Sequence, residues 1–366
     1  MRPRRRLTIR EVAEAAGVST QTVSRVLNNR PDVSAETFER VQQIITDTGY
    51  APNMLARGLI QGRSRTLGVV AYGLEYFGPT RVLTGIEQQA AEMGYSMSLN
   101  LIHQPEMDGV DGLLNSLSAR QVDGIIWAIP EVSRNRTWSH TKGPDFPVPV
   151  LLVGGMSGHS SLPSIAIDNY AIGRLATDHL LDGGARRIGI ITGPLNWWEA
   201  QERQRGWRET LEARGVPADD RLVVEGDWTA MSGEHGLDRL LETAPDIDAV
   251  FASNDQMALG VLHGAHRLGR PVPDDLSVVG ADDIAEGSHY WPSLTTVHQP
   301  LRDAGALAVK TIDELIRRSN GAVDAGNPTI ERDRLLAPAL IVRESSRFVP
   351  SADEPRGAAG PFDRGT

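Results

Sequence analysis

Residues 8–29 of the chain read TIREVAEAAGVSTQTVSRVLNN, and their pattern predicts the fold of the N-terminal module. It opens with a capping box, because the Thr8 hydroxyl can accept a backbone N–H while the Glu11 side chain reaches back to the cap. Apolar residues then recur at helical spacing and form one stripe: Ile9, Val12, Ala13 and Ala16. Gly17 ends this helix, since glycine enters the left-handed region freely, and Ser19 caps a second helix at once. A helix, a tight turn with glycine and a second helix form the helix-turn-helix arrangement.

The second helix separates apolar from polar side chains by face. Val23, Val26 and Leu27 are predicted to point inward. The outer face carries the five residues that we predict to read bases: Thr20, Gln21, Ser24, Arg25 and Asn28. Glutamine can pair with adenine and arginine with guanine, and the N-terminal end of a recognition helix enters the major groove. A small helical bundle without a partner is the alternative, and the polar outer face favours DNA.

A third helix follows in the same module. It is predicted to begin at Ser34, to end at Gly49 and to bury four apolar side chains: Phe38, Val41, Ile44 and Ile45. The three helices make up an all-α domain that we assign to residues 1–52.

The formal charge is distributed unevenly along the chain. Residues 1–65 hold eleven Arg and six Asp or Glu, a balance of +5, whereas the remaining residues carry a balance of −15. An acidic body with a basic head suggests that only the head meets a polyanion. An accidental basic head would look the same by charge alone, so the motif decides in favour of DNA.

Length and composition limit the class of protein. A chain of 366 residues is too long for one compact core, so more than one folding unit is expected. No stretch approaches the roughly 18 apolar residues of a membrane span, and no apolar segment follows the basic start as in a secretory signal. With no Cys, disulfides and thiolate metal sites are excluded. These features predict a cytoplasmic protein.

Enzyme and cofactor motifs are absent from the sequence. It contains no P-loop, no G-x-S-x-G elbow, no HExxH and no dinucleotide fingerprint. We therefore expect no catalytic activity, no cofactor and no metal site.

The head and the segment after it resemble a known family. Residues 8–29 are similar to the DNA-binding head of the LacI/GalR family of transcription regulators, and residues 50–59, YAPNMLARGL, resemble its linker. The resemblance implies that residues 53–65 form a hinge helix on DNA, with Leu59 wedged between base pairs in the minor groove. It also implies that Ala56 packs against the hinge of a partner subunit. Gly58 departs from the family pattern and costs a helix about 0.5–1 kcal/mol relative to Ala, so we expect a hinge that orders only on DNA.

From residue 66 on, predicted strands alternate with predicted helices. Strands are expected at 67–71, 95–102, 124–128, 188–192, 222–224, 249–252 and 277–280, and helices at 80–93, 109–119, 170–181, 200–214, 231–241 and 257–268. Two such series of βαβ units indicate an α/β core of two lobes, each a parallel sheet with helices on both faces. Ligands of parallel sheets lie beyond the carboxyl ends of the strands, so the predicted site is the cleft between the lobes.

This body resembles the periplasmic-binding-protein type I fold that forms the core of LacI/GalR regulators, and the similarity extends from about residue 8 to residue 343. It is densest in residues 225–233, 253–260 and 277–283. The resemblance implies a core for effector binding and dimerisation at residues 66–345. Within it, lobe 1 is expected at about 66–165 and 297–323, and lobe 2 at about 166–296 and 324–345. Residues 346–366 hold Pro, Gly and charge without leucine heptads, and we expect a disordered tail.

The same resemblance assigns residues to an effector pocket. It implies that Asn254 and Asp282 hydrogen-bond sugar hydroxyls and that Arg203 is a bidentate donor. Trp228 would lie against the apolar face of the sugar ring. The other pocket residues that it implies are Gln256 and Gln299, and, from the opposite lobe, Tyr76, Gly78, Pro79 and Val82. Planar polar groups with an aromatic platform suit the recognition of neutral polyols.

Structural interpretations of these residues stay open at this point. Asn254 and Asp282 can be helix caps, Trp228 can belong to an ordinary core, and Arg203 can be a solvated charge. The sequence also departs from the family in the pocket, since residues 153–155 read Val-Gly-Gly where an acidic residue is found, and Leu301 replaces an aromatic residue. The pocket is therefore expected to suit a different sugar or a larger glycoside.

Together these features predict a sequence-specific DNA-binding repressor whose operator affinity is controlled by a small sugar. Two heads that read two half-sites require a two-fold homodimer. An extracytoplasmic sugar-binding protein is a rival for the body alone, and the DNA-reading head opposes it. A regulator that needs a corepressor, with a non-sugar ligand, is the remaining alternative, because the sign of a ligand response depends on which lobe arrangement the ligand prefers.

Overall fold

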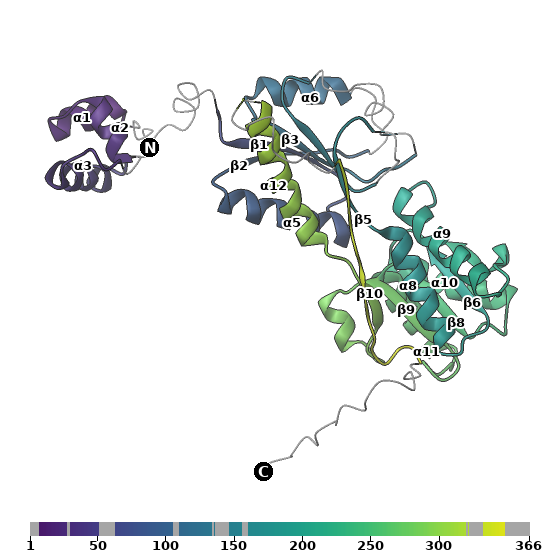
Figure 1. Cartoon of the computed structure of the whole chain (residues 1–366). Coiled ribbons are helices and arrows are strands. Elements are labelled where there is room, and N and C mark those ends of the chain that lie inside the picture. The colour runs from purple at the N-terminus through teal and green to yellow at the C-terminus, as the bar shows by residue number, and fades with distance from the viewer. Residues whose placement is uncertain are drawn as a thin grey trace, which may run out of the picture. The chain divides into compact units, whose positions relative to one another are not determined.

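The computed structural model describes residues 7–27, 30–50, 63–104, 110–133, 135, 146–155, 160–319, 321 and 332–347. The chain divides into two compact units, Met1–Arg65 and Thr66–Thr366, whose elements are labelled in Figure 1. The predicted hinge residues Ala56, Gly58 and Leu59 lie outside the described residues, as does the predicted tail from residue 348 on.

The first unit contains the three predicted helices. They are α1 (Ile9–Ala16), α2 (Thr20–Leu27) and α3 (Ala35–Thr48). The capping box forms as expected, because the Thr8 backbone N–H donates to Glu11 Oε2 at 2.7 Å and the Glu11 backbone N–H donates to Thr8 Oγ1 at 3.4 Å. Gly17 ends α1 in the left-handed region at φ 63°.

The core of this unit is smaller than the sequence suggested. Its buried side chains come from all three helices: Val12, Ala13, Ala16, Val23, Val26 and Val41. Of the four side chains expected to be buried on the third helix, only Val41 is, whereas Phe38, Ile44 and Ile45 are half-buried against the cluster. A unit of three short helices has too little interior to cover every apolar residue. A hydrogen bond from Arg40 Nε to the Ala16 carbonyl, at 3.2 Å, joins α3 to the end of α1.

The second unit begins with a six-stranded parallel sheet. Its strands are β1 (Thr66–Ala71), β2 (Ser96–Leu101), β3 (Gly124–Ala128), β4 (Val150–Val153), β5 (Ser164–Ile167) and β11 (Asp333–Leu336), in the order β11-β5-β4-β3-β1-β2. Successive residues of β3 face opposite sides, because Ile126 belongs to one apolar cluster and Ile125 and Trp127 to another. Helices α5 (Phe77–Glu92) and α12 (Leu301–Ser319) therefore cover one face and α6 (Val110–Ala119) the other (Figure 1).

A second six-stranded sheet follows. It contains β6 (Ile188–Thr192), β7 (Val223–Glu225), β8 (Ala249–Ala252), β9 (Ser277–Asp282), β10 (Thr295–His298) and β12 (Ala339–Ile341), in the order β12-β10-β9-β8-β6-β7. All described pairs in it are parallel except that of β12 with β10.

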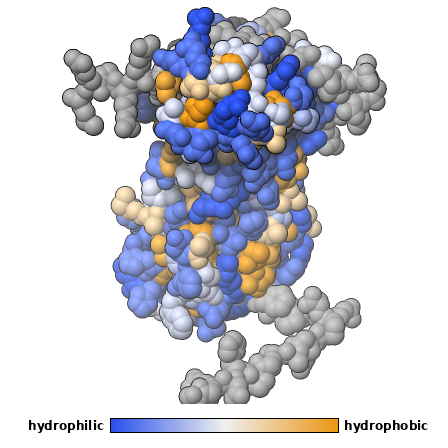
Figure 2. All heavy atoms as spheres, turned by 90° about the vertical axis from the view of Figure 1, so that its left-hand side faces the viewer, coloured by the Kyte–Doolittle hydropathy of each residue, from blue (hydrophilic) through white to orange (hydrophobic). Residues whose placement is uncertain are grey.

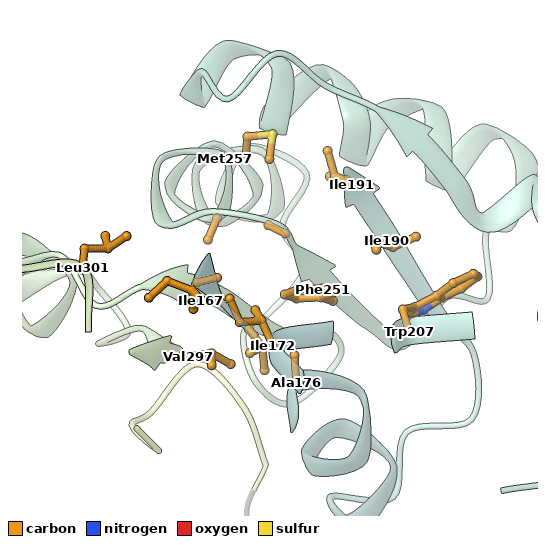
Figure 3. Packing of buried hydrophobic residues seen from close by; sticks show 14 of the residues in the cluster. Ile167, Ile172, Ala176, Ile190, Ile191, Trp207, Phe251, Met257, Val297 and Leu301 are labelled. Atoms are coloured by element: carbon orange, nitrogen blue, oxygen red, sulfur yellow. The ribbon is translucent and has the colours of Figure 1, made fainter. Parts of the chain in front are cut away.

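Helices cover both faces of the second sheet as well. They are α8 (Asn169–Asp182), α9 (Trp198–Ala213), α10 (Ala230–Thr243) and α11 (Asp255–Arg267), and two short 3-10 helices lie at Asp220–Leu222 and Ala285–His289. Ile190 of β6 points toward Trp207 of α9 (Figure 3). Its neighbour Ile191 faces α10, where it lies against Gly236. Helices α8 and α9 thus pack together on one face, and α10 and α11 on the other.

Glycines allow paired helices to approach closely in the second unit. A Cβ on Gly85 of α5 would lie 2.1 Å from the Arg302 carbonyl oxygen, and one on Gly305 of α12 would lie 2.2 Å from that of Val82. The α8–α9 and α10–α11 pairs make the same contact, through Gly173, Gly206, Gly233 and Gly260. Side chains at these positions would force the paired helices apart.

The chain crosses between the two sheets three times: from β5 to α8, from β10 to α12, and from β11 to β12. The last crossing differs from the predicted lobe boundary, which placed residues 324–345 in lobe 2. Strand β11 instead pairs in parallel with β5 of the first sheet. Residue 346 also falls outside the tail that was expected to begin there, because Ser346 is buried and its hydroxyl lies 2.7 Å from His179 Nε2.

On the face of the molecule seen in Figure 2, hydrophilic side chains predominate and apolar ones form separate groups. No helix within the described ranges is both long enough and apolar enough to cross a membrane.

Candidate functional site

The first candidate site is the outer face of α2. Thr20, Gln21 and Arg25 are exposed on it and Ser24 is half-buried, whereas Asn28 lies outside the described residues. Arg25 Nε lies 3.4 Å from Asp32 Oδ2 in an ion pair of which both side chains are about half exposed. An exposed ion pair of this kind contributes little to stability, so the guanidinium can leave Asp32 at little cost to contact another partner.

The second candidate site is a cavity of about 380 Å³ between the two sheets. Its lining residues lie at or beyond the carboxyl ends of nine strands of the two sheets, as the topology rule requires. All ten residues predicted for the effector pocket line it: Tyr76, Gly78, Pro79, Val82, Arg203, Trp228, Asn254, Gln256, Asp282 and Gln299.

Arg203 is buried at the centre of the polar end of this cavity. It projects from α9, where its Nε donates to Asn169 Oδ1 at 2.8 Å and its Nη2 donates to Gln299 Oε1 at 3.2 Å. Its Nη1 donates to the Ser253 carbonyl oxygen. The Arg203 side chain is buried, so the idea of a solvated surface charge does not hold. Its described partners are neutral groups, and a buried cation that has no carboxylate in direct contact is suited to receive polar groups of a ligand.

Asp282 is connected to Arg203 through Gln299, which hydrogen-bonds to both. Gln299 Nε2 donates to Asp282 Oδ1 at 2.6 Å, so Gln299 bridges the carboxylate and the guanidinium. Burial raises the pKa of the Asp282 carboxyl, and the positive charge of Arg203 opposes this rise. Burial also lowers the pKa of Arg203, while Asp282, Glu199 and Asp255 act in the opposite direction.

Three residues at the site have backbone conformations that residues other than glycine rarely adopt. Trp228 has φ 72°, and the consecutive residues Asp282 and Asp283 have φ 129° and 57°. Asp283 is fixed by Arg343 Nη2 at 2.7 Å and by His298 Nδ1 at 3.1 Å. Such strained residues persist only where their surroundings enforce them, and they gather at functional sites.

Asn254 is a helix cap, and it also lines the cavity. As the N-cap of α11, its Oδ1 accepts from the Met257 backbone N–H at 2.8 Å. Its Nδ2 donates to the Trp228 carbonyl oxygen at 3.0 Å and to Gln256 Oε1 at 3.1 Å. The residue therefore fixes the cavity wall as well as lining it.

Aromatic rings line another part of the cavity. The Trp228 ring lies against the Cα of Gly193, where a Cβ would be 2.0 Å from Cζ2, and the Arg203 Cζ is 5.5 Å from its centroid. Tyr76 caps α5 on the first-sheet side, followed by Gly78 and Pro79 in the first turn. Burial raises the pKa of the Tyr76 hydroxyl, with further contributions from Tyr72, Glu75 and Asp227.

Several lining residues were not anticipated from the sequence. They include Glu75 and Phe77 from the first lobe and Asn169, Trp197 and Glu199 from the second. The cavity therefore has carboxylates at Glu75 and Glu199. It lacks the acidic residue of the family pattern, where Gly154 lines the cavity, and the aromatic residue, which Leu301 replaces. Only the position of these residues in the sequence could have indicated their place in the cavity, since Trp197 and Glu199 follow the carboxyl end of the predicted strand 188–192.

The side chains present do not suggest a metal centre. Within the described ranges no group of three or more His, Asp or Glu is placed so that it could hold a metal ion.

Comparison with known proteins agrees with both units. Residues 8–53 match the model for bacterial regulatory proteins of the lacI family, and residues 177–346 match that for a periplasmic binding protein-like domain. The lactose operon repressor of Escherichia coli (strain K12) is 32% identical over 356 residues, which cover 96% of this chain and 94% of that protein.

Solved structures agree as well. The crystal structure of the lac repressor dimer bound to operator and the anti-inducer ONPF has a TM-score of 0.80 and 31% identity, covering 94% of this chain and 100% of that one. A transcriptional regulator CelR–cellobiose complex has a TM-score of 0.63 and 32% identity, covering 93% and 100%.

The helix-turn-helix unit and the two-sheet core thus define a DNA-binding transcriptional repressor and not an enzyme. The chain belongs to the LacI family. The predictions of family and fold class are confirmed.

Proposed function

We propose that this repressor binds its operator as a homodimer and that a small sugar or glycoside, bound in the cavity between the sheets, controls its operator affinity. The bridge Asp282–Gln299–Arg203 is the observation that carries this proposal. Only three of the five N–H donors of Arg203 are used by described residues, so donors remain for a ligand. A carboxylate, an amide and a guanidinium beside the Trp228 ring suit the hydroxyls and the apolar face of a sugar.

Relatives support the same class of ligand and the same assembly. The lac repressor structure is a dimer on operator DNA with an anti-inducer, and the CelR structure holds cellobiose. Because the proposed target is operator DNA, we expect the protein to act in the cytoplasm.

On the DNA side, we propose that Thr20, Gln21, Ser24, Arg25 and Asn28 contact the operator. In the linker, Leu59 would enter the minor groove and Ala56 would pack against the hinge of the partner subunit. The polar groups of α2 are placed at the end of a helix that follows a tight turn, which is the geometry of a recognition helix.

Control of affinity follows from differential binding. Residues of both lobes line the cavity, so a ligand bound there would stabilise the lobe arrangement in which those residues lie closest to it. A coupling free energy of about 1–3 kcal/mol between ligand and operator would be ordinary for such a system.

The proposal is tested by titrating the full-length protein onto a labelled DNA fragment from upstream of its own gene. Glucosides, galactosides and other sugars are then added one at a time. Release of the DNA by one sugar supports the proposal and identifies an inducer. Tighter binding identifies a corepressor, and the absence of any response to every sugar would rule out a sugar as the effector.

Two variants separate the two proposed sites. Arg25→Ala is expected to lose about 5- to 150-fold in discrimination between operator and unrelated DNA, because a bidentate contact to a base contributes about 1–3 kcal/mol. Asp282→Ala is expected to bind operator as the wild type does and to lose the response to the sugar. Electrophoretic mobility shifts with and without the sugar measure both, and a full response in Asp282→Ala would show that the pocket assignment is wrong.

A further inference from the structure

The loop between β6 and α9 connects the two lobes at the edge of the cavity. It belongs to the second lobe by sequence, yet the Ser133 backbone N–H donates to the Asn196 carbonyl oxygen at 2.7 Å. The Trp198 backbone N–H donates to the Glu131 carbonyl oxygen at 2.9 Å, and Val132 and Trp197 form an antiparallel bridge. This tryptophan loop, residues 196–198, is therefore fixed against the end of the first sheet.

The Trp197 ring is held between aromatic residues of both lobes. Its centroid lies 5.6 Å from that of Tyr76 and 6.2 Å from that of Tyr72, both from the first lobe. It lies 5.8 Å from that of Trp228 in the second lobe, and the Tyr76 and Trp228 contacts have edge-to-face geometry. Edge-to-face pairs of this kind are favourable beyond the burial of area, so the ring is positioned before any ligand arrives.

The cavity has a polar end and an aromatic end, joined by Trp228. Arg203 lies 5.5 Å from the Trp228 ring, Trp228 lies 5.8 Å from Trp197, and Trp197 lies 5.6 Å from Tyr76. A sugar ring that hydrogen-bonds to Arg203 and Asp282 can stack on Trp228. Trp197 and Tyr76 are then the first and second aromatic neighbours of Trp228 along the cavity wall.

We infer that Trp197 determines specificity: it receives a second ring, a sugar or an aryl group, so that the cavity selects two-ring glycosides over single sugars. This inference rests on the proposed function, since it presupposes a sugar ring at the polar end. A sugar ring presents apolar C–H groups on its face, and an aromatic shelf binds such a face without needing polar partners. The aliphatic Leu301 offers no such shelf on its side of the cavity.

The chain offers a matched control at the next position. Trp198 carries the same side chain in the same loop, but it is not among the residues that line the cavity. Trp197→Ala and Trp198→Ala both remove an indole from the loop, whereas only the first removes it from the cavity. Trp197→Phe keeps an aromatic ring at the site.

The experiment measures dissociation constants of the full-length proteins by isothermal titration calorimetry. The probes are the methyl glycoside, the phenyl glycoside and the β-1,4-linked disaccharide, in a glucose series and in a galactose series. For the series that binds, we expect the wild type to prefer the two-ring probes by at least tenfold over the methyl glycoside. We expect Trp197→Ala to reduce this ratio to below threefold while the affinity for the methyl glycoside changes little. Trp198→Ala should keep the ratio and Trp197→Phe most of it.

The outcomes that overturn the inference differ from those that overturn the proposed function. Equal affinity of the wild type for one-ring and two-ring probes overturns the inference alone, as does an equal loss for all probes in Trp197→Ala. If no probe of either series binds the wild type, the proposed sugar site fails and the inference fails with it.

Discussion

Asp255 is a fully buried carboxylate at the start of α11, next to the candidate pocket. Its Oδ1 accepts from the Thr296 hydroxyl at 2.6 Å, and its Oδ2 accepts from the Ile284 backbone N–H at 2.9 Å. The carboxylate thereby ties α11 to the ends of β9 and β10. Burial raises the pKa of this carboxyl to about 6, although both hydrogen bonds act to lower it.

This raised pKa predicts a pH-dependent stability. Below pH 6 the folded protein takes up a proton at Asp255, whereas the carboxyl of the unfolded chain stays ionised down to about pH 4. The folded state therefore binds more protons in this range, and this contribution to stability is lost as the pH rises through 6. Relative to Asp255→Asn, the free energy of unfolding of the wild type should fall by about 1–2 kcal/mol from pH 5 to pH 7.

Denaturant titrations followed by tryptophan fluorescence measure this difference. All seven Trp lie beyond residue 66, so their emission reports on the larger unit. Because the variant cannot titrate at position 255, the difference between the two proteins isolates this group. A difference that stays constant or grows with pH would contradict the prediction.

At the scale of the elements, helix pairs of the core rely on direct backbone approach. Gly85→Ala is expected to destabilise the protein by about 1–3 kcal/mol, because the new methyl group would meet the Arg302 carbonyl oxygen at 2.1 Å and α12 must move. Gly112 on α6 is exposed, and a Cβ added to it would meet no other atom within 4 Å, so Gly112→Ala should be neutral or stabilise by up to about 1 kcal/mol. Thermal unfolding of both variants checks this, and equal destabilisation in the two would contradict it.

The elements that the sequence predicted are those with a local signal. Strands 124–128, 188–192 and 249–252 were predicted with their observed bounds, because a buried strand is a continuous apolar run between turn residues. Strands β4, β5 and β10 and helix α12 were not predicted, although β4 and β5 are buried throughout. Strands β11 and β12 gave no local signal. Their residues, DRLL and ALI, lie at sheet edges and are partly exposed, and each pairs with a strand far away in sequence. Such pairing is decided by the assembled sheets and not by the strand itself.

In the candidate pocket, too, local sequence could indicate some residues and not others. The ten expected residues line the cavity, since strand ends and the family resemblance identify them. Trp197 was missed, because its place depends on residues 131–133 of the other lobe, more than 60 positions earlier in the chain. Nothing in the local sequence indicates that two strand ends from different sheets will pair.

At the scale of the whole molecule, the charge is divided between the two units. The balance of +5 in residues 1–65 and of −15 in the rest predicts that salt affects the two binding events differently. The operator affinity should fall steeply between 50 and 200 mM salt, with a slope of about −0.9 per phosphate contact, because counterions are released on binding. The affinity for a neutral glycoside should change less than twofold.

Fluorescence anisotropy with labelled DNA and calorimetry with the glycoside, at the same salt concentrations, measure the two dependences. A scrambled DNA fragment is the control for non-specific binding. Two results would contradict the assignment of DNA binding to the first unit and of glycoside binding to the second. They are an operator affinity that depends only weakly on salt, and a glycoside affinity that falls with salt as steeply as the operator affinity does.

Strands β11 and β12 stand only two residues apart in the chain, yet each forms the edge of a different sheet. A ribosome therefore completes neither lobe until almost the last of the folded residues has emerged. While residues 333–341 are still in the exit tunnel, β5 and β10 each present an unpaired edge to the surrounding cell. A message cut short upstream of residue 333 would thus yield a product in which both lobes lack an edge strand, and not a product with one finished lobe.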